Sequence, residues 1–172
     1  MEQPHVLQEP AGSGANLSPG KGVAGRLGRA ANILLIDDSR GDAMLARKAL
    51  GESRMDAVVT IASTGEMAMD ILRRQGEYSD SVLPDIILLD LRLPRMSGMD
   101  VLNLIKGDPR FKHIPVIVMS GTGASDTIMT CYRNYANAYL IKPGDLTQYR
   151  TAIDIIERFY LELAVLPVAA YD

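Results

Sequence analysis

The sequence has 172 residues, of which 47% are hydrophobic and 23% charged, and this composition is typical of a folded globular chain with one domain. The formal net charge of −3 at pH 7 argues against a protein that binds nucleic acid through a basic face. The sequence contains neither a membrane-spanning apolar run nor a secretory signal, and it has a single cysteine, so we expect a cytoplasmic protein without a disulfide or a Cys-rich metal site.

The chain divides into segments of different composition. Residues 1–31 are rich in Gly, Pro, Ser and Ala and contain no aromatic residue. Such a segment buries too little apolar surface to offset its conformational entropy, so we predict a flexible tail there. We expect one domain over residues 32–165, which includes a C-terminal helix extension, and a short tail at 166–172.

Short apolar runs alternate with segments of helical periodicity from residue 33 onward. The apolar runs predict strands at 33–36, 57–61, 85–90, 115–119 and 138–141. Helical spacing predicts helices around 44–51, 64–72, 99–106, 126–135 and 146–163, and the polar stretch 75–83 predicts a loop. This alternation is typical of an α/β fold in which helices cover both faces of a parallel sheet.

Five polar side chains follow the predicted strands: Asp37, Asp38, Asp90, Ser120 and Lys142. In open parallel sheets ligands bind beyond the carboxyl ends of the strands, so we expect these side chains to meet there. Two carboxylates ~4 Å apart repel each other by ~4 kcal/mol at an effective dielectric constant of ~20, so the cluster needs a cation. Carboxylate oxygens in a site with few protein ligands suit Mg²⁺.

This set of residues predicts phosphoryl transfer to a carboxylate. Asp90 is the expected nucleophile, because it ends the most apolar strand, and the product is an aspartyl phosphate. Asp37 and Asp38 would hold the metal. Lys142 would supply a second positive charge facing the phosphoryl group, since this reaction depends on positioning and charge neutralisation.

Four sequence blocks, at 33–39, 87–98, 115–121 and 139–143, resemble the signature blocks of response-regulator receiver domains and occur in the same order. The resemblance implies a flavodoxin-like (βα)₅ fold with strand order 2-1-3-4-5, and phosphorylation of Asp90 by a histidine kinase. It also implies that Asp38 and Asp90 ligate Mg²⁺ directly, that Asp37 acts mostly through water, and that Arg92 contributes its backbone carbonyl. Ser120 and Tyr139 stand at the family's switch positions.

A narrower resemblance concerns the loop at 73–79, the segment before Leu140 and the ending at 156–167. These parts are similar to single-domain regulators that partner phytochrome histidine kinases, so a bacteriophytochrome is the kinase we expect. Arg92 departs from the pattern, because these relatives often have Asn two residues after the phosphoacceptor. We predict that its guanidinium reaches the phosphoryl group or hinders the attacking water.

The output of this domain is expected to be protein contact, because the chain ends soon after the last predicted helix. We expect no nucleic-acid or membrane partner, and no turnover of an external substrate beyond the domain's own phosphorylation and dephosphorylation. The apolar residues Phe159, Tyr160 and Leu163 are expected to form or support a homodimer interface.

Other interpretations remain for the same residues. The domain could be a pseudoreceiver, an interaction module that takes no phosphate, although the full set of acids and Lys142 argues against this. An aspartyl phosphohydrolase would need a second acid two residues after its nucleophile, where Arg92 stands. Individually, Asp37 and Asp38 could be helix caps, Ser120 could start a turn, and Tyr139 could belong to the core.

Overall fold

Five strands and five α-helices alternate along the chain, and the computed structural model describes them over residues 27–53 and 56–167. The strands are β1 (Ala31–Ile36), β2 (Ala57–Ala62), β3 (Ile86–Leu89), β4 (Val116–Ser120) and β5 (Ala138–Ile141). The helices are α1 (Arg40–Gly51), α2 (Gly65–Arg73), α3 (Gly98–Gly107), α4 (Ser125–Arg133) and α5 (Leu146–Glu157), with a 3₁₀ turn η1 (Gly76–Tyr78) and a π-helical segment η2 (Arg158–Leu163).

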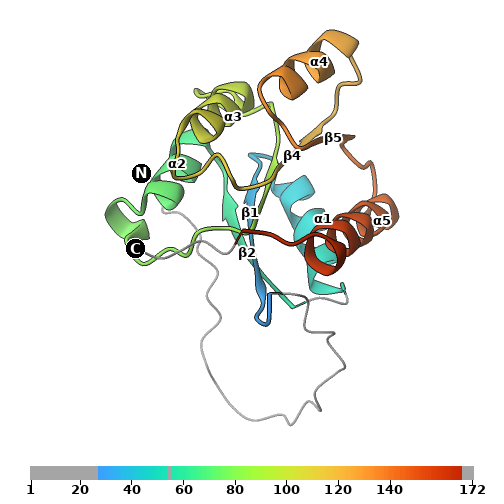
Figure 1. The fold of residues 1–172 in the computed structure, drawn as a ribbon. Coiled ribbons are helices and arrows are strands. Elements are labelled where there is room, and N and C mark those ends of the chain that lie inside the picture. The colour runs from blue at the N-terminus through green and yellow to red at the C-terminus, as the bar shows by residue number, and fades with distance from the viewer. Residues whose placement is uncertain (1–26, 54–55, 168–172) are drawn as a thin grey trace.

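The strands form one parallel sheet in the order β2-β1-β3-β4-β5. Figure 1 shows α1 and α5 together on one side of the sheet and α2 and α3 on the other. This is the doubly wound, flavodoxin-like arrangement that the sequence predicted, and the fold class is confirmed. The reversal of strand order lies between β1 and β3, where such sheets place their ligands.

Each face of the sheet has its own apolar core. In β1, Leu34 and Ile36 belong to the core under α2 and α3, whereas Ile33 and Leu35 belong to the core under α1 and α5. Strands β3 and β4 are buried along their whole length, because helices cover both of their faces. The edge strand β2 is different, and its Val58 side chain is 55% exposed.

Side-chain caps fix where the helices begin. The hydroxyl oxygen of Ser39 accepts from the backbone of Asp42 at the start of α1, and Thr64 caps α2 in the same way. Ser97 and Asp100 form a reciprocal capping box, so α3 begins at Gly98, one residue before the predicted start. The N-cap residue of α1 is therefore Ser39, and not Asp37 or Asp38.

The last predicted helix, 146–163, changes its geometry at residue 158. The backbone N–H of Ala164 donates to the carbonyl of Phe159, five residues earlier, at 2.8 Å. This π-type bond ends the regular α-helical ladder of α5 and widens the final turn.

The amino-terminal boundary of the domain is anchored by Arg29, whose guanidinium donates to both oxygens of Asp85 at 2.7 and 2.8 Å. Strand β1 begins at Ala31, one residue before the predicted boundary. The remainder of the predicted tails, residues 1–26 and 168–172, lies outside the described residues. Across residues 27–53 and 56–167, no helix is long and apolar enough to cross a bilayer.

Candidate functional site

Backbone hydrogen bonds between neighbouring strands align the carboxyl ends of the strands at the same edge of the sheet. The N–H of Asp37 donates to Ala62 at 3.0 Å, and the N–H of Asp90 donates to Ile36 at 2.9 Å. On the other side, the N–H of Lys142 donates to Ser120 at 2.8 Å. The parallel register therefore places the five predicted strand-end residues, Asp37, Asp38, Asp90, Ser120 and Lys142, at the carboxyl edge of the sheet.

The ammonium group of Lys142 is the centre of the site. Its Nζ lies 2.7 Å from Oδ2 of Asp90, 2.9 Å from Oδ2 of Asp37 and 2.8 Å from Oδ2 of Asp42. Burial by itself would lower the pKa of Lys142, but the hydrogen bonds to Asp42, Asp90 and Asp37 outweigh it and raise that pKa above its ordinary value. Lys142 therefore stays charged in this site.

Three carboxylates form the candidate metal site. Asp37, Asp38 and Asp90 each offer one oxygen, and these oxygens lie within 4.8 Å of one another. Asp37 and Asp90 are buried, whereas Asp38 is exposed and faces solvent, where a hydrated ion arrives. Hard oxygen donors with one open side fit Mg²⁺ or Mn²⁺, so the residues present fit the expected group.

Two backbone N–H groups orient the buried carboxylates. Oδ1 of Asp37 accepts from Ser39 at 2.9 Å, and Oδ1 of Asp90 accepts from Arg92 at 3.1 Å. Burial raises the pKa of Asp37, and the hydrogen bonds from Lys142 and Ser39 only partly offset this. Arg92 contacts Asp90 through its backbone N–H. The metal-ligand role of the Arg92 carbonyl oxygen stays a prediction.

The side chain of Arg92 lies over the β4–α4 loop. A Cβ placed on Gly121 would lie 2.9 Å from Nη2 of Arg92, so the guanidinium sits directly against this backbone. Gly121 directly follows Ser120, and Arg92 lies two residues after Asp90. The predicted reach of Arg92 toward the site is therefore compatible with where its guanidinium lies.

Ser120 ends β4 with its side chain inside the protein. The residue is 1% exposed, and its Oγ has no hydrogen-bond partner among the described residues. A buried hydroxyl without a hydrogen-bond partner lowers the free energy of unfolding by about 1–3 kcal/mol, so a serine at this position calls for a functional explanation. A phosphoryl oxygen next to Asp90 is the acceptor that the family resemblance assigns to it.

Tyr139 is half-buried and packs against the core, which was one of the two roles weighed from the sequence, whereas its switch role stays a prediction. Its ring packs against the core beneath α2, α3 and α4, and its hydroxyl donates to the carbonyl of Thr122 at 2.7 Å. Its backbone N–H donates to the hydroxyl of Tyr132 at 3.1 Å. The tyrosine thus ties β5 to the loop that follows Ser120.

The sequence analysis missed Asp42, Thr122 and Tyr132. Asp42 carried a signal, because it lies in the first turn of a helix that begins directly after Asp37 and Asp38. Side chains in a helix tilt toward its N-terminus, which points Asp42 back at the strand ends. Thr122 accepts from the Tyr139 hydroxyl through its backbone carbonyl, and a pattern of side chains cannot predict such a contact.

The three predicted interface residues all lie in η2, the π-helical segment that follows α5. Phe159 is 55% and Leu163 69% exposed, whereas Tyr160 is half-buried and packs edge-on against the Phe159 ring at 4.9 Å. Ile155 and Val165 add to this exposed apolar strip, which we call the α5–η2 strip.

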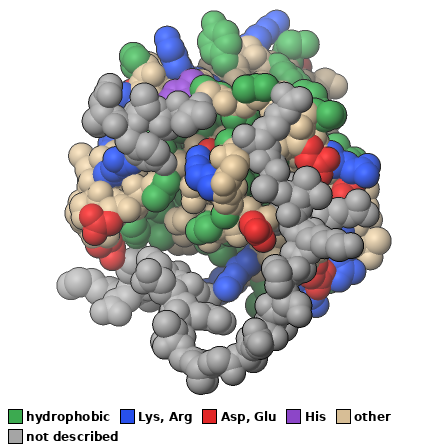
Figure 2. All heavy atoms as spheres, turned by 60° about the horizontal axis from the view of Figure 1, so that its bottom comes forward, with side chains coloured by type: hydrophobic (Ala, Val, Ile, Leu, Met, Phe, Trp, Pro, Cys, Tyr) green, Lys and Arg blue, Asp and Glu red, His purple; other side chains and the backbone are tan. Residues whose placement is uncertain are grey.

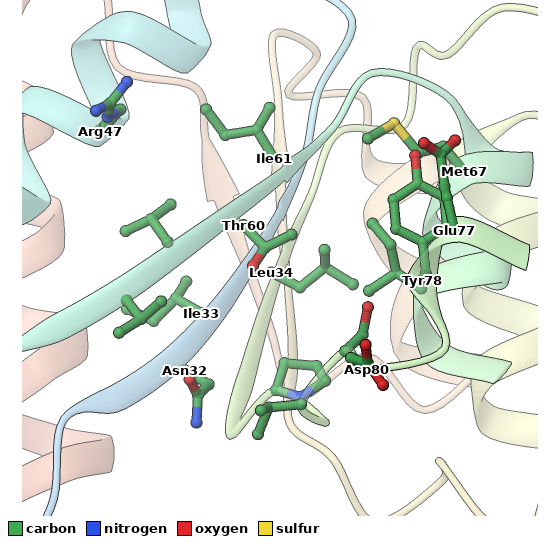
Figure 3. Close-up of a pocket in the computed structure, with 16 residues that line it drawn as sticks. Asn32, Ile33, Leu34, Arg47, Thr60, Ile61, Met67, Glu77, Tyr78 and Asp80 are labelled. Carbon is green, nitrogen blue, oxygen red and sulfur yellow. The ribbon is translucent and has the colours of Figure 1, made fainter. Parts of the chain in front are cut away.

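A cavity of about 560 Å³ lies elsewhere, between β1, β2 and the loop before β3. Figure 3 shows Tyr78 and Met67 on one side of it and Thr60 and Ile61 of β2 on another. Asp37, Asp90 and Lys142 do not line it. Arg47, Glu77 and Asp80 line the cavity, but it holds no group of three acids around a lysine, so we look for the chemistry at the strand-end site.

The doubly wound sheet has three aspartates, a buried serine and a lysine with an 8% exposed side chain at its carboxyl edge, and these are the fold and site expected of a phosphoacceptor signalling domain. A family model described as "Response regulator receiver domain" matches residues 33–154, and the chain belongs to this family.

Relatives of known name support a narrower grouping. The response regulator Rcp1 of Synechocystis is 39% identical over 80% of this chain and 93% of its own length. The crystal structure of the phosphorylated cyanobacterial phytochrome response regulator RcpA is 38% identical over 81% of this chain and all of that one, with a TM-score of 0.77. The structure of the Mn²⁺-bound form of Rcp1 is 38% identical over 80% of this chain and 99% of that one, with a TM-score of 0.75. The domain is thus related to phytochrome response regulators.

Proposed function

We propose that this receiver domain accepts a phosphoryl group on Asp90 from the phosphohistidine of a sensor histidine kinase and signals through protein contact. The observation that carries the proposal is the buried contact of 2.7 Å between Lys142 and Asp90, inside a cluster of three carboxylates. A buried lysine next to a buried nucleophile places a positive charge where the phosphoryl oxygens arrive. The pseudoreceiver interpretation has no comparable observation in its favour.

In the transfer step, an oxygen of Asp90 attacks phosphorus and forms a P–O bond. The P–N bond to the kinase imidazole breaks, and the electron pair stays on that nitrogen, which takes up a proton from solvent. A carboxylate nucleophile attacks through a lone pair on oxygen, so this step uses no general base. The N–H of Arg92 and the ammonium of Lys142 hold the two Asp90 oxygens in fixed directions before the attack.

Asp37, Asp38 and Asp90 would hold Mg²⁺, and Arg92 would add its backbone carbonyl. The bound ion supplies charge neutralisation for the carboxylates and the phosphoryl oxygens. The relative crystallised with Mn²⁺ supports a divalent ion at this acidic site. The exposed position of Asp38 keeps one side of the site open to the donor.

The switch consists of Ser120 and Tyr139. The unpaired Ser120 hydroxyl turns to donate to a phosphoryl oxygen, and this movement draws the β4–α4 loop toward Asp90. Tyr139 is held to the same loop through the carbonyl of Thr122, so the loop movement repositions its ring. Phosphorylation thereby repacks β4, α4 and β5, which form the proposed partner surface.

The upstream partner we propose is a bacteriophytochrome-class histidine kinase, because similar proteins are phytochrome response regulators. The exchange takes place in the cytoplasm. The domain is not an enzyme for an external substrate, and it catalyses only its own phosphorylation and dephosphorylation. Nucleic acid and membrane are not among its proposed partners, and in Figure 2 acidic and basic side chains are interspersed on the described part of the face shown.

The domain limits of 32–165, with tails on either side, are part of the same proposal. A second copy of the chain is the proposed partner of the α5–η2 strip, through Phe159, Tyr160 and Leu163. Large exposed apolar side chains that adjoin one another favour such a contact. Light scattering tests this part: Phe159→Asp should convert a dimer to a monomer, and a wild type that is monomeric with and without phosphate contradicts it.

Intact-mass measurement tests the phosphotransfer. The protein is incubated with acetyl phosphate in the presence of Mg²⁺ or of a chelator, and wild type is compared with Asp90→Asn. Asp126→Asn, an exposed acid on α4, serves as the matched control. We expect a phosphoryl adduct on wild type and control that requires Mg²⁺ and is absent from Asp90→Asn. If a phosphorylated kinase also yields no adduct on wild type, the pseudoreceiver interpretation replaces this proposal.

A further inference from the structure

Lys142 has a carboxylate partner that does not come from a strand end. Oδ2 of Asp42, in the first turn of α1, lies 2.8 Å from the ammonium. Asp42 is outside the group of three acids that would hold the metal. Its side chain is 34% exposed, against 8% for Lys142 and 3% for Asp90, so it covers the ammonium from the solvent side.

The position of Asp42 is set by the start of α1. Its backbone N–H donates to the Ser39 hydroxyl at 3.3 Å, which closes the N-cap. Since side chains tilt toward the helix N-terminus, this cap directs the Asp42 carboxylate at the site. Asp42 is therefore held in place by its helix on one side and by Lys142 on the other.

The ammonium of Lys142 has no spare donor in this arrangement. A lysine side chain carries three N–H groups, and here they serve Asp37, Asp90 and Asp42. To bind a phosphoryl oxygen, Lys142 has to release one of these acceptors. The Asp90 oxygen that becomes esterified loses its negative charge, and Asp37 is a proposed metal ligand. Asp42 is the acceptor that is neither phosphorylated nor among the proposed metal ligands.

We infer that Asp42 is a positioning residue that competes with the phosphoryl group for Lys142 and thereby shortens the life of the phosphorylated state. The inference rests on the proposed phosphorylation of Asp90. An aspartyl phosphate carries roughly one negative charge more than the carboxylate it replaces. The adjacent charge of Asp42 opposes this increase and retains one donor of the ammonium.

The substitution Asp42→Asn removes the charge and keeps the shape of the side chain. It should lower the acetyl phosphate concentration that half-saturates phosphorylation, and lengthen the phosphate lifetime after the donor is removed, by roughly fivefold to tenfold, as for loss of a partly exposed charged hydrogen bond. Asp42→Glu keeps the charge and should restore a lifetime near that of wild type. Asp154→Asn removes an equal charge from the distal half of α5, where Asp154 pairs with Arg158, and should behave as wild type.

A second readout needs neither metal nor phosphate. In metal-free protein, the ¹⁵N resonance of the Lys142 ammonium should shift in Asp42→Asn and remain in place in Asp154→Asn. A wild type that takes no phosphoryl mass overturns the proposed function, and the inference with it. A wild type that is phosphorylated, with an equal or shorter phosphate lifetime in Asp42→Asn, overturns the inference alone.

Discussion

The Nζ of Lys142 lies 2.7 Å from Oδ2 of Asp90, although 52 positions separate the two residues in the chain. This contact joins the loop after β5 to the end of β3 across the end of β4. It places one buried positive charge among carboxylates that would otherwise repel one another. We therefore expect the free energy of unfolding and the proposed phosphotransfer to depend on the same pair.

The first prediction concerns the loss of this positive charge. Lys142→Met leaves the buried Asp37 and Asp90 without their cation, and breaking a buried ion pair costs about 3–5 kcal/mol. We expect a decrease of about 3 kcal/mol in the free energy of unfolding in chelator, measured with urea, and partial recovery in Mg²⁺, because a ligand that binds only the folded state stabilises it. The control Lys48→Met, on the exposed side of α1, should change little. Equal stability of Lys142→Met and wild type in chelator would show that the ammonium does not balance these acids.

The second prediction separates metal binding from folding. Asp38 is the exposed member of the three acids, so Asp38→Asn should change the free energy of unfolding in chelator by no more than about 0.5 kcal/mol. It should nevertheless abolish the rise in melting temperature that Mg²⁺ produces in wild type. Thermal melts at several Mg²⁺ concentrations measure this. A Mg²⁺-dependent rise that persists in Asp38→Asn argues against Asp38 as a ligand.

The third prediction contrasts two serines. The Ser120 hydroxyl is buried and unpaired, so Ser120→Ala should leave the unphosphorylated protein as stable as wild type, or more stable by about 1 kcal/mol. Ser97 caps α3, and Ser97→Ala should cost about 1 kcal/mol. Urea unfolding of both variants decides the matter. A clear destabilisation by Ser120→Ala would mean that its hydroxyl is already hydrogen-bonded in the resting state.

The fourth prediction contrasts two glycines beside the site. A Cβ on Gly98 would lie 2.1 Å from the carbonyl oxygen of Asp90. This oxygen belongs to the backbone, so the clash can be relieved only if the chain moves. Gly98→Ala should cost about 3 kcal/mol or more, because overpacking forces the backbone to shift. A Cβ on Gly121 meets the flexible end of Arg92 instead, so Gly121→Ala should cost less than about 1 kcal/mol. Similar costs for the two variants in urea unfolding would contradict this packing argument.

The fifth prediction is a pH dependence that originates at Glu157, at the end of α5. The residue is 3% exposed, and Oε1 has no hydrogen-bond partner among the described residues. Burial raises the pKa of Glu157 to about 7, the hydrogen bond from Ser53 lowers it, and nearby Asp154 and Glu162 add to the rise.

Because the pKa of Glu157 is higher in the folded state than its ordinary value of 4.5, the folded chain binds more protons between these two values. Its contribution to stability is therefore present at low pH and is lost as the pH rises through about 7. Glu157→Gln removes this dependence. Urea unfolding at pH 5 and pH 8 should show wild type losing about 2 kcal/mol relative to Glu157→Gln. Parallel pH profiles for the two proteins would contradict a buried, titrating Glu157.

The sequence by itself determined the order of the strands and helices and the identity of the strand-end residues. Continuous apolar runs predicted β1, β3 and β4, because strands covered on both faces have no polar side to show. Parallel strands share one carboxyl edge, so the sequence predicts that Asp37, Asp38, Asp90, Ser120 and Lys142 meet there. The predicted boundaries of α2, α3 and α4 differed from the observed ones by one or two residues. Helix α1 begins at Arg40, four residues before its predicted start, and the regular part of α5 ends at Glu157, six residues before its predicted end.

Only the tertiary structure decided which atoms of these residues touch. That Lys142 also binds Asp42, that the Ser120 hydroxyl is left unpaired and that Glu157 is enclosed all depend on segments distant in sequence. The reason is physical: strand and helix patterns repeat over a few residues and are visible locally. A contact between side chains from distant segments depends instead on how the helices pack against both faces of the sheet, and no local pattern in the sequence shows this.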